Sequence, residues 1–416
     1  MARSVSIFDV SGLPFWRRPI FLLFIMAVAM PVAFNVWSAL LNNFVVQVAN
    51  FDGSDIGLLH TVREVPGFLA IGVILLIMVI KEQTLGLISL ATLGVATAVT
   101  AYFPSMIGLL TVTLISSFGF HYFETVNQSL QLQWLPKEKA PQFIGWLFGA
   151  ASVATLFAYI GIIVGWKKLG LSFNFLYLSS GGLTALIAIF CLIFFPNFRT
   201  ETKPITKLVI RRRYWLYYAL ELLSGARRQI FVVFAAFMMV EKFGFEVHQL
   251  TALFLINLVI NIFAAPLFGY FIAHFGERRA LLIEYSGLIC VFLAYGGVYL
   301  FDWGVVLAAT LFVLDHLFFG LRIALKTYFQ KISSPEDIAP TAAVALSINH
   351  IAAIFLPVLL GLLWLVSPTI VFMVAAFLAF LSFLLALLVP KLPIDGNEIL
   401  PIPKTYSKKK TESKSC

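Results

Sequence analysis

Apolar segments long enough to cross a lipid bilayer fill almost the whole chain. We predict twelve of them, at residues 20–46, 56–80, 84–102, 105–132, 142–165, 173–195, 214–240, 249–273, 280–300, 304–330, 341–364 and 369–389. A helix needs about 20 mostly apolar residues to span the hydrocarbon core. Only 12% of the residues are charged, whereas soluble domains carry about 25%. We therefore predict an all-α integral membrane protein and not a water-soluble enzyme.

Lysine and arginine are distributed unevenly between the two sides of the membrane that these spans define. Of the 29 basic residues, five lie within spans and only Lys167, Lys168 and Lys242 lie in loops on one side. The other 21 lie on the side that holds both termini. Cytoplasmic loops are enriched in Lys and Arg, so we expect a multi-pass protein of the cell membrane with both termini in the cytoplasm. The net charge of +9 then reflects orientation, and we expect no nucleic-acid partner.

The spans divide into two groups of six. A polar, basic linker at 196–213 separates residues 1–195 from residues 214–390, and a basic tail follows at 391–416. A short proline-bounded motif at 136–141, after the fourth span, returns 199 residues later at 335–340, after the tenth. This offset is about half of the chain, so we interpret the two groups as related halves.

The loop between spans eight and nine carries a recognisable motif. It reads Gly-Tyr-Phe-Ile-Ala-His-Phe-Gly-Glu-Arg-Arg from Gly269 through Gly276 to Arg278 and Arg279. It resembles the signature loop of the major facilitator superfamily, with Ala273 in place of the usual aspartate. The resemblance implies two pseudo-symmetric six-helix bundles that rock around a central cavity. It also implies that the glycines and arginines of this loop form a clasp; the alternative is that the arginines only mark the cytoplasmic side.

Charged and polar residues follow single stripes on several spans. In this family spans one, four, seven and ten line the central cavity, which is what the resemblance implies for this chain. The polar residues that we place there are Asn35 in span one, His121 and Glu124 in span four, Glu221, Arg227 and Arg228 in span seven, and Asp315, Arg322 and Lys326 in span ten. Residues seven and eleven apart nearly eclipse on a helix, so we expect the three charges of span ten on one stripe.

We treat nine charged residues as lying in the membrane: the seven just named, and Arg63 and Glu64 in span two. Each costs about 2.5–3.5 kcal/mol when it faces lipid at the bilayer centre. These side chains must therefore face water or one another. One interpretation is a structural ion-pair network that holds helices together. The other is a binding site for an anion, because five of the nine are cations and a guanidinium suits carboxylate or phosphate.

We assign provisional roles on the second interpretation. Substrate binding is predicted for Arg228 and Arg322 first, and then for Arg227, Lys326 and Asn35. Proton coupling is predicted for Glu124, Asp315, His121 and Glu221, although a packing role is the alternative for His121. Arg63 and Glu64 are predicted to form an outer gate, or else a fixed ion pair. No spacing of histidines and acids suits a metal ion, and we expect no metal and no cofactor.

These features together predict a secondary active transporter. The sequence has no ATP-binding motif, so we expect proton-coupled movement of a small organic anion by a monomer in the bilayer. One alternative is an exporter of drugs or other amphipathic compounds, which the 42 phenylalanines would suit. Another is a sensor or assembly protein that has this fold and transports nothing.

Overall fold

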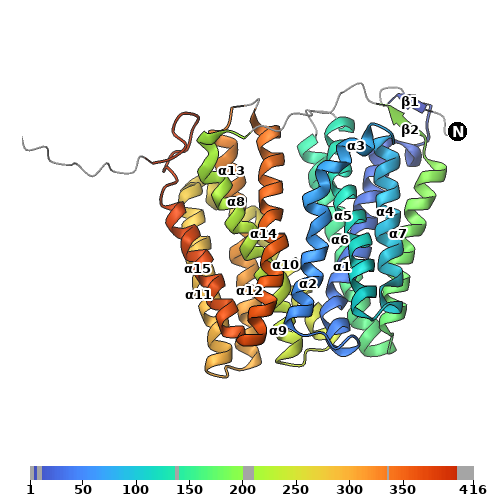
Figure 1. The fold of residues 1–416 in the computed structure, drawn as a ribbon. Coiled ribbons are helices and arrows are strands. Elements are labelled where there is room, and N and C mark those ends of the chain that lie inside the picture. The colour runs from blue at the N-terminus through green and yellow to red at the C-terminus, as the bar shows by residue number, and fades with distance from the viewer. Residues whose placement is uncertain (1–3, 7–11, 136–139, 200–209, 335–336, 401–416) are drawn as a thin grey trace, which may run out of the picture.

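The computed structural model describes residues 4–6, 12–135, 140–199, 210–334 and 337–400. Long helices run side by side between two opposite faces of the molecule (Figure 1). We call the end that carries residues 12–18 and 390–400 the terminal face. The opposite end, with the turns at 48–52 and 242–246, is the distal face.

The first half of the chain forms one bundle. Its elements are β1 (Ser4–Ser6), η1 (Phe15–Arg17), α1 (Pro19–Gln47), α2 (Gly53–Phe68), η2 (Leu69–Gly72), α3 (Val73–Ile77), α4 (Glu82–Val99), η3 (Thr100–Tyr102), α5 (Met106–Trp134), α6 (Ala140–Leu169), α7 (Phe173–Phe194) and β2 (Asn197–Arg199). Strands β1 and β2 pair in parallel at the terminal face.

The second half forms the other bundle. Its elements are η4 (Arg212–Tyr214), α8 (Trp215–Gln229), η5 (Ile230–Ala235), α9 (Ala236–Glu241), α10 (Val247–Phe275), α11 (Glu277–Leu300), α12 (Val305–Gly320), α13 (Ile323–Ile332), α14 (Ile338–Val366) and α15 (Pro368–Ala386). Segments α8, η5 and α9 form one continuous rod, and η5 is a π-helix in its middle. Such segments are rare and are found mostly at functional sites.

The twelve predicted spans agree with the helices. Eleven described helices are long and apolar enough to cross a membrane. The remaining predicted span corresponds to α2, η2 and α3, where one short 3₁₀ segment interrupts the helix after Pro66. When the interrupted segment α2–η2–α3 is counted as one span, each bundle holds six spans. The prediction of an all-α membrane fold is confirmed.

Capping residues set where several helices begin. Asp52 accepts hydrogen bonds from the backbone of the first turn of α2, and Asp55 bonds back in a capping box. The hydroxyls of Ser105 and Ser172 cap α5 and α7 in the same way. Pro19 and Pro368 occupy the first positions of α1 and α15, where no backbone N–H is needed. These caps place the distal turns and so fix the length of each span.

The two bundles share a core toward the distal face and have separate cores toward the terminal face. One buried cluster joins both halves, for example through Phe44, Phe237 and Trp364. Two further clusters lie within single halves, one around Met26 and the other around Tyr328. The halves are therefore packed together most extensively at their distal ends.

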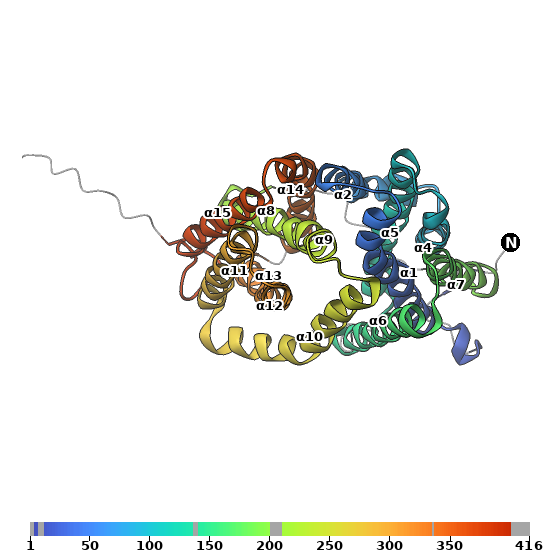
Figure 2. The same ribbon diagram turned by 90° about the horizontal axis from the view of Figure 1, so that it is seen from below.

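Helices α2 and α14 form the closest junction between the halves (Figure 2). At Gly361 a side-chain carbon would lie 2.5 Å from the carbonyl oxygen of Gly53, so only glycine permits this approach. Thr61 also inserts its hydroxyl into α14: it donates to the carbonyl of Ile354 at 2.7 Å and accepts from the N–H of Val358 at 3.2 Å. Pro357 lies inside this part of α14 and has no N–H to donate, so the side chain from the other half bonds to the helix next to a missing helix hydrogen bond.

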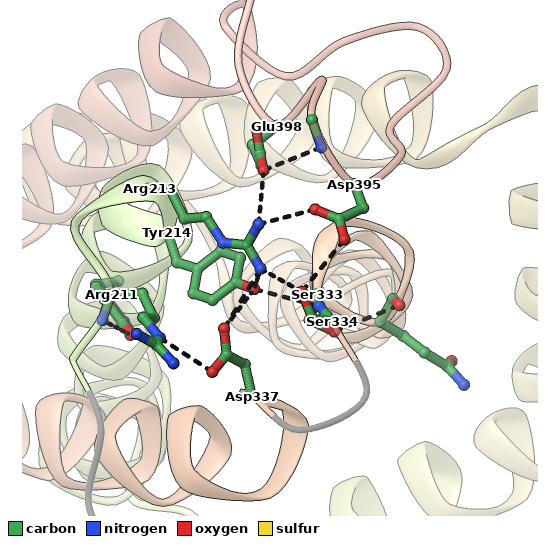
Figure 3. Close-up of polar contacts among 11 residues, drawn as sticks. Arg211, Arg213, Tyr214, Ser333, Ser334, Asp337, Asp395 and Glu398 are labelled. Carbon is green, nitrogen blue, oxygen red and sulfur yellow. Dashed lines mark hydrogen bonds and ion pairs between the residues drawn. The ribbon is translucent and has the colours of Figure 1, made fainter.

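A polar cluster at the terminal face of the second half ties three segments together (Figure 3). Arg211 and Arg213, just before α8, both pair with Asp337 before α14, at 3.0 and 3.3 Å. Arg213 also pairs with Asp395 at 2.8 Å. The hydroxyl of Tyr328 donates to the backbone carbonyl of Glu398 at 2.7 Å. Residues 390–400 are therefore held across the end of this bundle, as in Figure 3.

Candidate functional site

A cavity of about 280 Å³ lies between the two halves. It is lined by Phe34, Trp37, Ser38, Arg63, Glu64, Thr113, Ser116, Ser117, Phe120, His121, Arg228 and Val232. Ligand pockets for drug-sized molecules span roughly 300–1,000 Å³, so this space suits a small molecule. Its wall combines three aromatic rings, four hydroxyl groups and two arginines.

Glu64 lies at the centre of the polar groups of this cavity. Its Oε1 is 2.7 Å from Nη2 of Arg63, the preceding residue. Its Oε2 is 2.9 Å from Nδ1 of His350 on α14 and 3.5 Å from Nη2 of Arg228 on α8. The side chain of Glu64 is only 1% exposed. We call Arg63, Glu64, Arg228 and His350 the central cluster; it joins the two halves through one carboxylate.

The central cluster continues along the second half. Nη2 of Arg228 lies 3.4 Å from Oδ1 of Asn349. Asn349 donates through Nδ2 to Oε2 of Glu221 at 3.2 Å, and Glu221 pairs with Arg322 at 3.1 Å. A continuous path of polar contacts thus runs from α2 through α8 and α14 to the end of α12. Arg228 and Arg322 keep about a quarter of their side chains exposed, so both arginines can also meet a ligand.

Arg227 points away from this path, into the interior of the second half. Successive residues of a helix differ by about 100° in direction, which separates Arg227 from Arg228. Nη2 of Arg227 lies 3.5 Å from Oε1 of Glu284, and its guanidinium lies 4.3 Å from the ring of Tyr285. Asp315 is 1% exposed, and the charge of Arg227 acts on it. Neither carboxylate oxygen of Asp315 has a hydrogen-bond partner among the described residues.

The predicted stripe of span ten is wrong. Helix α12 ends at Gly320, Leu321 and Arg322 form a turn, and α13 begins at Ile323. This break separates the three charges: Asp315 is buried inside the second half, Arg322 reaches Glu221, and Lys326 is exposed beyond the turn. Of the three, only Arg322 joins the path of contacts at the cavity.

Of the remaining predicted residues of the first half, His121 lines the cavity, whereas Glu124 and Asn35 do not. His121 lines the cavity and contacts His350 edge to face, with ring centroids 5.0 Å apart. Glu124 is exposed one turn further along α5. Asn35 donates its amide to Thr155 at 2.8 Å, which ties α1 to α6 and leaves this amide outside the cavity wall.

The signature loop lies at the terminal face of the second half. Gly276 has a φ of +85°, a conformation that favours glycine, and it makes the turn between α10 and α11. The ion pair formed at this turn joins Glu277 to Lys331, at 2.6 Å. Within the described parts of the chain Arg278 and Arg279 make no ion pair, and Gly269 faces open space. Gly276, Arg278 and Arg279 thus lie at one turn, and the ion pair at this turn is formed by Glu277 and Lys331.

Three residues of these clusters were not predicted. Glu284 falls only four residues after the start of span nine, next to the loop arginines, and so was not counted among the membrane charges. His350 and Asn349 carry no predicted role. A signal for the last two exists in the sequence, because Asn349 and His350 are adjacent polar residues in an otherwise apolar span. No group of three or more His, Cys, Asp or Glu side chains among the described residues is arranged for a metal ion.

Comparison with known proteins agrees with this architecture. The family model described as Major Facilitator Superfamily matches residues 22–357. The nucleoside transporter NupG superposes with a TM-score of 0.70 at 16% identity, covering 88% of this chain and 98% of that one. A bacterial homologue of the human lysosomal transporter Spinster, inward-facing and occupied, gives 0.66 at 13% identity, with coverage of 87% and 96%.

A third solved structure is a POT family transporter in complex with 5-aminolevulinic acid, with a TM-score of 0.67 at 12% identity and coverage of 92% and 98%. A search of curated protein sequences finds no match. At these identities the solved structures show the fold, whereas the family model covers most of the chain itself. The chain is therefore a multi-pass membrane transporter, not an enzyme, and it belongs to the major facilitator superfamily.

Proposed function

We propose that this transporter moves a small organic anion, coupled to protons, by alternating access between its two halves. The observation that carries the proposal is the balance of charge in the central cluster: Arg63 and Arg228 share the single carboxylate of Glu64. One positive charge is left over at the wall of a cavity whose remaining polar side chains are four hydroxyls, His121 and the indole of Trp37. A buried surplus cation favours a ligand of charge −1.

Arg228 is the proposed anion contact, because it is partly exposed to the cavity and lies near its centre. Arg322 extends the site on the side of α12. The aromatic rings of Phe34, Trp37 and Phe120 suit a planar or apolar body on the anion. The other predicted substrate contacts have less support. Arg227 lies in the interior of the second half, and Lys326 lies beyond the turn that follows α12. The amide of Asn35 is bonded to Thr155.

Orientation follows from charge. The terminal face carries most of the basic residues, and we place it in the cytoplasm of a cell membrane. Since the distal ends of the halves are packed together, the described conformation is then inward-facing. Arg63 and Glu64 would serve as the gate that closes the outer side. We propose a monomer, since one chain holds the complete cavity.

An exporter of amphipathic compounds is the second candidate. The three aromatic rings at the cavity wall favour it. The two candidates differ in the charge of the ligand that they accept, because two arginines at the wall disfavour a cation. A cationic amphipathic ligand that binds in the cavity would therefore support the exporter and count against the anion site.

A ligand-stabilisation screen with purified protein tests the proposal. The panel includes benzoate, 5-aminolevulinic acid, a nucleoside, organic phosphates and cationic amphipathic compounds. Binding raises the melting temperature of the folded state by mass action. We expect small monoanions to stabilise the wild type and not Arg228→Gln, while Lys326→Gln, beyond the helix break, serves as the matched control. Stabilisation that survives in Arg228→Gln, or that only cations produce, would refute the anion site. Uptake of the stabilising anion into proteoliposomes with and without a pH gradient then tests coupling.

A further inference from the structure

We infer that Glu64 is an internal counter-anion of the substrate site, and that competition between Glu64 and the substrate couples anion binding to the uptake of one proton. The inference rests on the proposed anion site at Arg228. It names a different acid from those that the sequence suggested for coupling, which were Glu124, Asp315 and Glu221. It also links coupling to the gate, because Glu64 is bonded across the two halves.

The position of Glu64 supports the competition. Its Oε2 lies 3.5 Å from Nη2 of Arg228, which is the guanidinium that we propose for the substrate. That distance is long for a charge-assisted pair, which normally measures about 2.7–2.9 Å. Glu64 therefore holds Arg228 loosely and the adjacent Arg63 tightly, at 2.7 Å. An anion that enters the cavity must share Arg228 with a carboxylate already present.

A proton on Glu64 removes this competitor. The neutral acid no longer repels the incoming anion, and Arg63 and Arg228 both become available to it. Anion affinity is then higher when Glu64 is protonated. By reciprocity the bound anion must favour protonation of Glu64 by the same factor. The proton comes from water at the cavity, which Glu64 lines, and it stays on the carboxyl oxygen until the anion leaves.

The same proton weakens the tie between the halves. Both groups bonded to Oε2, from His350 and Arg228, belong to the second half, while Glu64 belongs to the first. Loss of the negative charge removes the ion pair with Arg228 and leaves hydrogen bonds to a neutral carboxyl, which are weaker than those to a carboxylate. Loading with an anion and a proton therefore favours separation of α2 from α14 at the distal face.

The groups around Glu64 that could take up the proton in its place must be considered in the experiment. Arg63 and the buried His60 lie on α2, His121 on α5, Arg228 on α8 and His350 on α14. Both arginines stay charged at all working pH values. Histidine is the side chain that ordinarily titrates near neutral pH, so these three residues must be separated from Glu64 by substitution.

Calorimetry with benzoate as the probe tests the coupling. Titrations in buffers of different ionisation enthalpy count the protons taken up for each benzoate bound. We expect proton uptake in the wild type that approaches one proton per benzoate as the pH is lowered, and none in Glu64→Gln at any pH. At pH 8 Glu64→Gln should bind benzoate about tenfold or more tightly than the wild type because the competitor is gone. His60→Asn, His121→Asn and His350→Asn should retain proton uptake. Glu277→Gln, which removes a similarly buried acid whose partner Lys331 is half-exposed and lies in the same half, is the matched control and should also retain it.

Several results would overturn the inference. Proton uptake that persists in Glu64→Gln, or that vanishes only in a histidine variant, assigns the proton to another group. Benzoate binding to the wild type without proton uptake also contradicts it. Glu64→Asp, which keeps the charge on a shorter side chain, should fold and keep proton uptake even where Glu64→Gln gives little protein.

A second arm needs no substrate and distinguishes failure of this inference from failure of the anion site. Spin labels at Tyr102→Cys and Val366→Cys, both exposed near the distal face, report the separation of the halves in a protein without native cysteines. Glu64→Gln should shift the distances toward longer values, and Glu277→Gln should not. Unchanged distances in Glu64→Gln would refute the tie, whereas absence of anion binding to the wild type would refute only the proposed site.

Discussion

Gly57 and Pro357 meet so closely that a side-chain carbon on Gly57 would lie 2.3 Å from the carbonyl oxygen of Pro357. The contact joins α2 to α14, and so joins the first half of the chain to the second. Only backbone atoms separate the two helices at this point. The distal closure of the cavity thus depends on the absence of one methyl group.

Replacing Gly57 by Ala should open the distal side. Overpacking costs about 1–3 kcal/mol, and a shift of about 1.4 kcal/mol changes the ratio of closed to open states tenfold. We expect a membrane-impermeant thiol reagent, added from the distal side, to label Ser38→Cys in the cavity about tenfold faster in Gly57→Ala. Gly149→Ala is the control, because a side chain there meets nothing within 4 Å. Equal labelling rates in the two variants would contradict the role of this contact.

Arg227 should contribute more to stability than Arg228, although the two residues are adjacent. Arg227 and Glu284 are 1% and 0% exposed, and removal of one partner from a buried pair costs on the order of 3–5 kcal/mol. We expect Arg227→Met to lower the melting temperature in detergent strongly, and Arg228→Gln to lower it little. Arg227→Met combined with Glu284→Leu should recover part of the loss. A double variant less stable than Arg227→Met would argue against the pair.

Asp337 should make the terminal-face cluster sensitive to acid. Burial works to raise the pKa of Asp337, but hydrogen bonds from Arg211 and Tyr214 outweigh it and hold the pKa below its ordinary value of 3.8. A lowered pKa means that the charged form stabilises the fold. This contribution is complete above the ordinary value and is lost as the pH falls through the lower, folded value.

A spin label on Leu392→Cys, which is exposed on the 390–400 segment, measures this effect. Its mobility should stay constant at neutral pH and increase only in acid below the ordinary pKa of an aspartate. Asp337→Asn should show the increased mobility already at pH 7. Asp302→Asn, which removes an exposed pair with Lys242 at the distal face, should leave the label unchanged. Identical mobility in Asp337→Asn and the wild type would disprove the anchoring role of Asp337.

The orientation proposed from basic residues can be tested with two single cysteines. Lys167→Cys places a thiol in the last turn of α6 at the distal face, and Lys81→Cys places one just before α4 at the terminal face. In intact cells an impermeant thiol reagent should label the first and not the second until the membrane is opened. Labelling of both from the same side would contradict the topology.

The sequence predicts the helices well because bilayer length and apolar composition constrain each span locally. It predicts the site only in part. The ion pair between Arg63 and Glu64 is one of the two predicted alternatives for these residues, but the contacts of Glu64 with Arg228 and His350 depend on how α2 packs against the other half. Such packing has no local signature in one sequence.

The errors have physical causes. The stripe on span ten assumed a continuous helix from Asp315 to Lys326, and the turn after Gly320 ends it. Glycine weakens a helix interior, so this residue was the available warning. Glu284 was overlooked because a charge near the end of a span resembles a loop residue. Only its contact with the buried Arg227 shows that Glu284 lies in the interior of the second half.

The hydroxyl of Thr61 also determines what α14 must do when the halves separate. The carbonyl of Ile354 and the N–H of Val358, which both bond to Thr61, are four residues apart and so are natural partners within a helix. Once Thr61 withdraws, they can bond directly and the turn around Pro357 can tighten. Opening of the transporter therefore need not leave polar backbone bare in an apolar environment, because the two backbone groups that the departing hydroxyl contacts can satisfy each other within α14.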